Sequence, residues 1–253
     1  MLITERKFGI FKILNVHFVE DPVSVDIPDW DVVTYHAYKK WDVTNEFETQ
    51  QSFTTIIDLR QDIDVIWKKI KKTHKQHIRR ADKNGIKITV SDNYERFHQE
   101  YKKFLNQKNN VDLFGLRILS SQYMQKYGVL FLAEKQDEFL GGNLYFHDQD
   151  SAFIVNIAYP KLGISNDKNK CIYDANCFLH WKAMQYFKNQ GFINYDFGGL
   201  KSGEISISHQ MDGLDFFRRS FGGDVILHYQ YRKYKSRFNK LLFQSSNFLH
   251  TLI

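Results

Sequence analysis

The chain has 253 residues and a mass of 30.1 kDa, which at roughly 150 residues per domain indicates one large domain, or a domain and a smaller part. Hydrophobic residues make up 43% of it and include 22 Phe, 14 Tyr and 4 Trp, so a disordered or collagen-like chain is excluded. The 35 Lys and Arg outnumber the 29 Asp and Glu, and the resulting net charge of +6 favours anionic partners such as phosphates, nucleic acid or lipid headgroups.

Two cysteines, Cys171 and Cys177, are too few for a disulfide framework, and we expect both to be structural thiols in a reducing compartment. Neither has the histidine spacing of a zinc site, and the pair His74 and His77 lacks a carboxylate partner in the sequence, so no metal is predicted. The N-terminus has no apolar run after its first charges, and no stretch approaches the roughly 20 apolar residues of a membrane span. The sequence therefore predicts a cytoplasmic protein that is soluble, or at most peripheral to a membrane.

The first 60 residues have the pattern of short strands and turns, and the run 54–59 is rich in β-forming residues. From Asp62 apolar residues recur every three or four positions, which predicts one amphipathic helix that ends at Asn84-Gly85. Most of the excess positive charge is expected on this helix, because its cations face a single acid, Asp82, between residues 68 and 83. These cations are Lys68, Lys69, Lys71, Lys72, Lys75, Arg79, Arg80 and Lys83.

Strands and helices of ordinary length follow the basic helix. They are a strand at 86–90, helices at 94–107 and 120–127, and an antiparallel meander of strands at 129–134, 139–146 and 152–159. After a polar loop at 161–170, an apolar row from Ile172 to Tyr186 predicts a helix that Gly191 stops. The run 192–197 is the next strand, so strand, helix and strand predict a right-handed crossover into a parallel pair.

Two glycine pairs mark the ends of predicted elements in the remaining sequence. Gly198-Gly199 is expected to end the strand 192–197, and Gly222-Gly223 to separate a helix at 213–220 from a strand at 225–231. Residues 232–253 are basic and amphipathic, and predict a helix that docks on its own domain or contacts a membrane surface or another subunit. The predicted organisation is an N-terminal lobe over 1–85, a core module over 86–231 and a C-terminal tail over 232–253.

The order of these elements resembles the plan of the Gcn5-related N-acyltransferases (GNAT), and three motifs resemble the Fem-type branch of peptidoglycan-bridge aminoacyltransferases. Residues 75–86, KQHIRRADKNGI, are similar to the family's basic helix end, NIRKAxKxGV; residues 191–199, GFINYDFGG, to GxxxYDFGG; and residues 213–223, GLDFFRRSFGG, to GIxxFKxxFGG. The resemblance implies an α/β (α+β) fold in which helices flank a mixed, largely antiparallel sheet, with a smaller N-terminal lobe. Arg218 stands where the family usually has lysine, and the two-module members of the family are longer than this chain.

The resemblance implies direct transfer of an acyl or aminoacyl group to an amine. In this fold the reacting carbonyl lies where two parallel strands splay apart, so the backbone N–H groups of Ile157 and Ala158 are candidates for stabilising the oxyanion. Asp196 is the leading candidate for the group that takes or orients the amine proton, and the alternative is a carboxylate that caps the following turn. Gly198 and Gly199 would let a ligand approach the backbone.

Further residues are candidates for binding the substrates. Arg218 could hold an anionic group, and the alternative is a surface arginine that pairs with Asp215. Tyr159 and Tyr195 are expected to line the pocket. His209 is a weaker candidate for the base.

The donor is either an acyl-CoA, such as acetyl-CoA, or a charged tRNA. The segment 159–170 lacks the glycine-rich RxxGxG turn that cradles the pyrophosphate in acyl-CoA-using members of the superfamily. The basic helix offers phosphate contacts for tRNA instead, with Lys75 and Arg79 as the expected ligands, although a run of lysines can equally be a solvated face.

The sequence thus predicts a cytoplasmic N-acyltransferase that acts on an amine of an anionic acceptor, such as a nucleotide-linked amino sugar or a cell-wall precursor. The alternatives are an aminoacyl-tRNA-dependent transferase of the peptidoglycan-bridge type, and a non-catalytic module that binds RNA or an anionic surface on the same fold.

Overall fold

The computed structural model describes residues 1–8, 11–20, 29–107, 119–160, 165–200 and 213–251. They form two compact units, the first made of Met1–Phe53 and Ile226–Ile253 and the second of Thr54–Val225. Among the described residues, no helix combines the length and the hydrophobicity needed to cross a bilayer.

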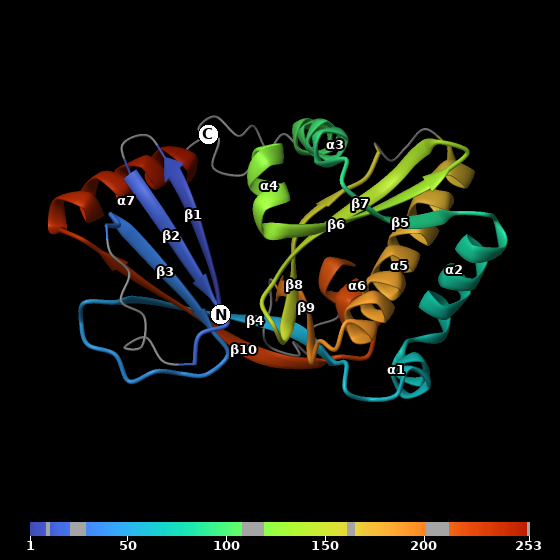
Figure 1. Ribbon diagram of the computed structural model, residues 1–253, viewed down its shortest axis with the longest axis horizontal. Helices are drawn as coiled ribbons and strands as arrows, with labels where there is room; N and C mark the ends of the chain where they lie inside the picture. Colours follow the sequence, from blue (N-terminus) through green and yellow to red (C-terminus); the bar gives the residue numbers. More distant parts are fainter. Residues whose placement is uncertain (9–10, 21–28, 108–118, 161–164, 201–212, 252–253) are drawn as a thin grey trace. The chain divides into compact units, whose positions relative to one another are not determined.

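The first unit is a sheet with the strand order β1-β2-β3-β10-β4 (Figure 1). The strands are β1 (Leu2–Phe8), β2 (Phe11–His17), β3 (Val32–Ala37), β10 (Asp224–Tyr234) and β4 (Glu48–Asp58), of which β10 and β4 also enter the second unit. The β1–β2 and β3–β10 pairs are antiparallel, and β2 runs parallel to β3. One face packs Tyr231 against the ring of Trp41, with centroids 4.5 Å apart. The other face packs against α7 (Arg237–Thr251) through Phe243.

The second unit continues from β4 in the order β4-β9-β8-β7-β6-β5. Its strands are β5 (Lys87–Ser91), β6 (Gly128–Lys135), β7 (Glu138–His147), β8 (Ser151–Ala158) and β9 (Asn194–Leu200); its helices are α1 (Ile63–Lys69), α2 (Lys72–Lys83), α3 (Tyr94–Gln107), α4 (Ser121–Tyr127), α5 (Asn166–Asn189) and α6 (Gly213–Arg219). Strands β5 to β8 form an antiparallel meander, and α5 connects β8 to the parallel strand β9.

Helices cover both faces of this second sheet (Figure 1). A Cβ at Gly141 of β7 would lie 3.4 Å from Leu179 of α5, whereas a Cβ at Gly142 would lie 2.8 Å from Phe97 of α3. Neighbouring residues of a strand point to opposite faces, so α5 and α3 lie on opposite sides of β7. The predicted α/β fold, with a mixed and largely antiparallel sheet between helices, is confirmed.

Two predicted elements differ from the structure because buried contacts interrupt or prolong them. The single basic helix is two helices, α1 and α2, separated at Ile70, which is extended (φ −62°, ψ 133°) and only 2% exposed. The next residue, Lys71, donates its N–H to the Ser220 carbonyl at 2.9 Å. The strand predicted to end at Phe197 runs through both glycines to Leu200. Thr54 and Arg218 bond the carbonyls of the glycine pair, and Gly198, which has no Cβ, tolerates a φ of +76° within the strand.

The remaining boundaries move for local reasons. Helix α5 begins inside the predicted polar loop, because the Ser165 hydroxyl caps it by accepting the Lys168 N–H at 3.2 Å. Strand β10 reaches Tyr234 in the predicted tail, because its last six residues pair with β3. The compact units therefore divide the chain at other positions than the predicted 85 and 231: the basic helices lie in the second unit, and the tail belongs to the first.

We predict that Gly222→Ala destabilises the protein by about 3 kcal/mol or more, whereas Gly85→Ala costs only about 1 kcal/mol. Both glycines have positive φ, +80° and +71°, so alanine is strained at either position. At Gly222 a Cβ would also lie 2.6 Å from the Lys69 carbonyl oxygen, whereas at Gly85 it would meet nothing within 4 Å. Urea unfolding measures both free energies, and equal losses would contradict the close packing at Gly222.

Candidate active site

Asp196 lies on β9 as a buried carboxylate, 4% exposed, and is bonded to two neighbours. Its Oδ1 accepts the N–H of Gly198 at 2.7 Å, and the hydroxyl of Thr54 on β4 donates to the same oxygen. The Thr54 hydroxyl also lies 2.8 Å from the Gly198 carbonyl oxygen, so its one proton serves one acceptor at a time. Asp196 therefore makes the contact expected of a turn cap, and it holds a negative charge against the backbone at Gly198.

Arg218, on α6, reaches the same glycine pair from the other side. Its Nη1 donates to the Gly199 carbonyl oxygen and lies 3.3 Å from the Gly198 carbonyl oxygen. The structure thus brings together Asp196, Gly198, Gly199 and Arg218, which the sequence predicted as one site. A carboxylate and a guanidinium are both bonded there to a stretch of backbone whose two residues have no side chains of their own.

Tyr195, the neighbour of Asp196, belongs to a buried chain of hydrogen bonds rather than to an open pocket wall. Its side chain is 0% exposed, and its hydroxyl oxygen lies 2.7 Å from the Tyr145 hydroxyl oxygen and 2.6 Å from Nδ1 of His180. Asn143 donates its amide N–H to the Tyr145 hydroxyl at 3.2 Å. These hydrogen bonds join β7, β9 and α5, and they hold β9 in place beside Asp196.

Burial keeps the side chains of this hydrogen-bond network uncharged. Burial, together with the positive charge of Arg218, lowers the pKa of His180 to about 3. It raises the pKa values of Tyr145 and Tyr195 above their ordinary value of 10. His180 Nε2 is buried and finds no hydrogen-bond partner among the described residues, and the ring lies 4.9 Å from that of Phe197. We therefore assign His180 a positioning role through Tyr195.

The sequence analysis missed His180, Tyr145 and Thr54. The only available signal was the placement of two polar residues inside apolar runs, His180 between Leu179 and Trp181 and Tyr145 between Leu144 and Phe146. Contacts that join a strand, a distant strand and a helix leave no spacing in the sequence, so the network itself could not be read from it.

Ile157 and Ala158, the candidates for binding an oxyanion, lie at the end of β8. Both pair with β7, opposite Asn143 and Gly142. The parallel ladder of β8 and β9 covers only Ser151–Phe153 with Asn194–Asp196, although both strands continue. The half-buried Tyr159 follows β8 and stands edge-on to Phe104, with centroids 4.5 Å apart. The two parallel strands thus stop pairing next to Asp196.

Lys75 and Arg79 gather around Trp67 instead of around Asp196. Their charged groups lie 5.8 Å and 5.5 Å from the Trp67 ring centroid, within the range of cation–π contacts. Another cation of α2, Arg80, is structural, because its Nε donates to the Asp174 carboxylate on α5 at 2.5 Å. Lys75 and Arg79 therefore have Trp67, rather than Asp196, as their recorded partner.

Three further possibilities from the sequence concern a metal site, the two cysteines and His209. No group of His, Cys, Asp and Glu in the described part of the chain is arranged to hold a metal ion. Burial raises the pKa values of Cys171 and Cys177, so both are thiols rather than thiolates. His209 lies outside the described residues.

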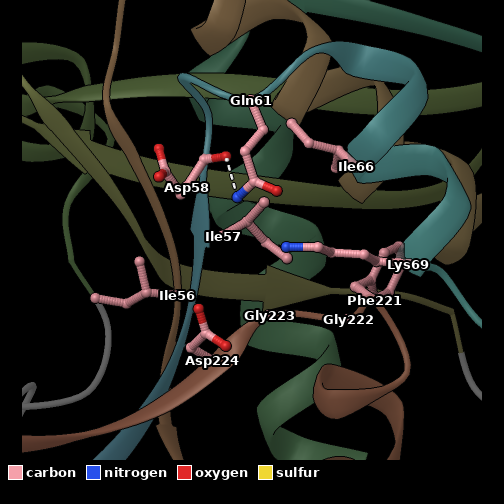
Figure 2. A pocket seen from close by; sticks show the side chains of 10 residues that line it. All are labelled: Ile56, Ile57, Asp58, Gln61, Ile66, Lys69, Phe221, Gly222, Gly223 and Asp224. Atoms are coloured by element: carbon pink, nitrogen blue, oxygen red, sulfur yellow. Dashed lines mark hydrogen bonds between the residues drawn. The ribbon is translucent and has the colours of Figure 1, made fainter.

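Two cavities occur elsewhere. The one in Figure 2 has a volume of about 10 Å³, room for one water molecule. Its walls are Ile56, Ile57, Asp58, Gln61, Ile66, Lys69, Phe221, Gly222, Gly223 and Asp224. The other, of about 190 Å³, lies on the first unit, between Glu48, Thr49, Gln50, Gln230 and Arg232. Neither is lined by Asp196, Tyr195 or Tyr159, so neither marks the predicted site.

Comparison with known proteins supports the fold. No family model matches the sequence, and no curated protein matches it. Among solved structures, the C-terminal domain of a lysylphosphatidylglycerol synthetase from Agrobacterium fabrum is similar with a TM-score of 0.62 at 14% identity, covering 98% of this chain and 85% of that one. FemX is similar with a TM-score of 0.62 at 12% identity (96% and 85% covered), and L-PGS from Bacillus licheniformis with 0.60 at 13% (97% and 84%). The chain therefore has the fold of these proteins, and the expected likeness to the Fem-type branch is confirmed at the level of the fold.

We predict that His180 makes the protein less stable in acid. The unfolded pKa of 6.5 exceeds the folded pKa of about 3, so between these values the unfolded chain binds one more proton. Stability then falls as the pH falls, by about 1.4 kcal/mol per pH unit for this group. His180→Gln should lower the slope of the free energy of unfolding between pH 4 and pH 6 by about that amount, as measured by urea titrations. An unchanged slope would mean that His180 is already protonated in the folded protein.

Proposed function

We propose that this protein is an N-acyltransferase that moves an acyl or aminoacyl group to an amine on an anionic acceptor, such as a nucleotide-linked amino sugar or a cell-wall precursor. The observation that carries the proposal is the meeting of Asp196 and Arg218 at the Gly198-Gly199 backbone, beside the point where β8 and β9 stop pairing. Solved structures with the same fold include FemX and a lysylphosphatidylglycerol synthetase, whose name describes the making of an aminoacylated anionic lipid.

In this mechanism the acceptor amine attacks the donor carbonyl, which lies between the diverging strands. Of the backbone N–H groups at Ile157 and Ala158, the one that points away from β7 stabilises the oxyanion. A C–N bond forms and the C–S or C–O bond of the donor breaks, while Asp196 takes a proton from the amine and returns it to the leaving group. Arg218 holds the anionic part of the acceptor, and the planar guanidinium suits a phosphate or carboxylate in two-point contact.

Both donor classes stay within the proposal. The chain lacks the glycine-rich turn of acyl-CoA-using relatives, whereas Lys75 and the exposed Arg79 beside Trp67 could contact the phosphates of a charged tRNA. Cations and an aromatic ring on one surface also suit a non-catalytic RNA-binding module, and that is the second candidate function.

Acetyl-CoA should raise the melting temperature in a saturable manner, because a ligand that binds the folded state at a hundred times its Kd stabilises it by about 2.7 kcal/mol. Adenosine diphosphate is the control for binding through the nucleotide alone. If acetyl-CoA gives no shift but the protein transfers an aminoacyl group from charged tRNA, the donor is the tRNA. If neither donor supports transfer to amines while RNA binds with a steep dependence on salt, the enzyme proposal is wrong and the binding module is favoured.

The variant Asp196→Asn should distinguish a role of Asp196 as the catalytic base from a role as a turn cap alone. The asparagine oxygen can still accept the Gly198 N–H, so we expect the melting temperature to change little, while turnover falls by about a hundredfold or more because the amide cannot take a proton. Steady-state transfer assays with the donor identified as above measure the rate. Asp174→Asn is the matched control, since Asp174 is another buried carboxylate of the same unit that pairs with Arg80, and it should keep turnover per folded molecule. An unchanged rate in Asp196→Asn would leave Asp196 only its structural role.

A further inference from the structure

The C-terminal helix α7 is attached to the first unit by one side only. Its Asn239 donates an amide N–H to the Asp31 carboxylate at 3.0 Å, and Lys240 and Gln244 reach Oε1 of Glu48 at 2.8 Å and 2.7 Å. Phe243, 7% exposed, packs on Phe11, Ile13 and Val32 of the sheet. These contacts fix the orientation of the helix on its sheet.

The opposite side of α7 presents large apolar side chains to solvent. Phe238 is 67% exposed and Leu241 is 65% exposed, more than any other large apolar side chain whose exposure the structure describes. Residues three apart share one face of a helix, so Phe238 and Leu241 form one apolar face, which we call the α7 face. An apolar pair held outward by a docked helix is typical of a surface that meets another phase or partner.

The segment that carries the α7 face has only positive charges of its own. Residues 232–253 contain five Lys and Arg and no Asp or Glu. Lys233 and Lys240 are paired with Glu46 and Glu48, whereas Lys235 and Arg237 are exposed and have no carboxylate partner within the described residues. These two cations lie one to three positions before Phe238, so apolar side chains and unpaired positive charge come together at the start of the helix.

We propose that the α7 face binds the surface of an anionic lipid bilayer. Phe238 and Leu241 enter the boundary between headgroups and acyl chains, and Lys235 and Arg237 contact the anionic headgroups. A second copy of the chain is a poorer partner, because a symmetric contact through this face would bring the cations of two copies together without counter-charges. A bilayer with anionic lipid supplies both the apolar layer and the negative charge. The proposal stands independently of the acyltransferase function.

Sedimentation of the full chain with vesicles tests this directly. The parent protein should bind vesicles of phosphatidylcholine mixed with phosphatidylserine, more weakly as salt rises, and should bind vesicles of pure phosphatidylcholine much less. The double variant Phe238→Ser/Leu241→Ser should bind about tenfold more weakly or worse, because it loses the apolar anchor. The variant Lys235→Gln/Arg237→Gln should lose the preference for the anionic vesicles.

Leu227→Ser is the matched control, since Leu227 is an exposed leucine of the same unit on β10, and it should bind as the parent does. Circular dichroism and the unfolding midpoint confirm that each variant folds, which is expected because both substituted side chains of the α7 face lie in solvent. Equal vesicle binding by the parent and the Phe238/Leu241 variant would overturn the proposal. The proposal would also be overturned if the parent protein did not bind vesicles but formed a dimer, and if the Phe238/Leu241 variant did not form that dimer. The α7 face would then be assigned to self-association.

Discussion

The buried hydroxyl of Tyr195 is the contact on which the arrangement of the candidate site depends. It joins β9 to β7 through Tyr145 and to α5 through His180, with oxygen–oxygen and oxygen–nitrogen distances of 2.7 Å and 2.6 Å. Side chains alternate along a strand, so fixing Tyr195 in the core also fixes the direction in which the next residue, Asp196, leaves the strand. Uncharged partners suit such a depth, because an ion pair there would carry a large desolvation cost.

The glycine pair after Asp196 gives this arrangement its chemistry. Gly198, with a φ of +76°, turns the backbone within β9, so that its N–H meets the Asp196 carboxylate while the carbonyls of Gly198 and Gly199 meet Arg218. The carboxylate of Asp196 and the guanidinium of Arg218 are thus both bonded to the same two-residue stretch of backbone. A site of this kind is organised before a substrate arrives, which is the condition for stabilising a transition state by electrostatics.

The cations that give the protein its net charge of +6 have more than one structural role. Arg80 of the basic helix holds α2 to α5 through the buried Asp174, whose side chain is 2% exposed, and Lys240 holds α7 to β4 through Glu48. Arg79, Lys235 and Arg237 remain exposed. Total charge therefore indicates affinity for anions in general, but only the placement of each cation tells which surface has charge left for a partner.

Short-range patterns determined much of this protein. The spacing of apolar residues predicted α3 at residues 94–107 and the three-strand meander, because a helix face and a strand face follow from local periodicity. The motif containing Asp196, Gly198 and Gly199, and the motif containing Arg218, also named the residues that meet. Only the tertiary structure decided that the basic helix breaks at Ile70, that β9 continues through its glycines, and that Thr54 and His180 support the site. These outcomes depend on contacts between residues far apart in the chain, such as Thr54 and Asp196, which are 142 positions apart, and no local pattern records such contacts.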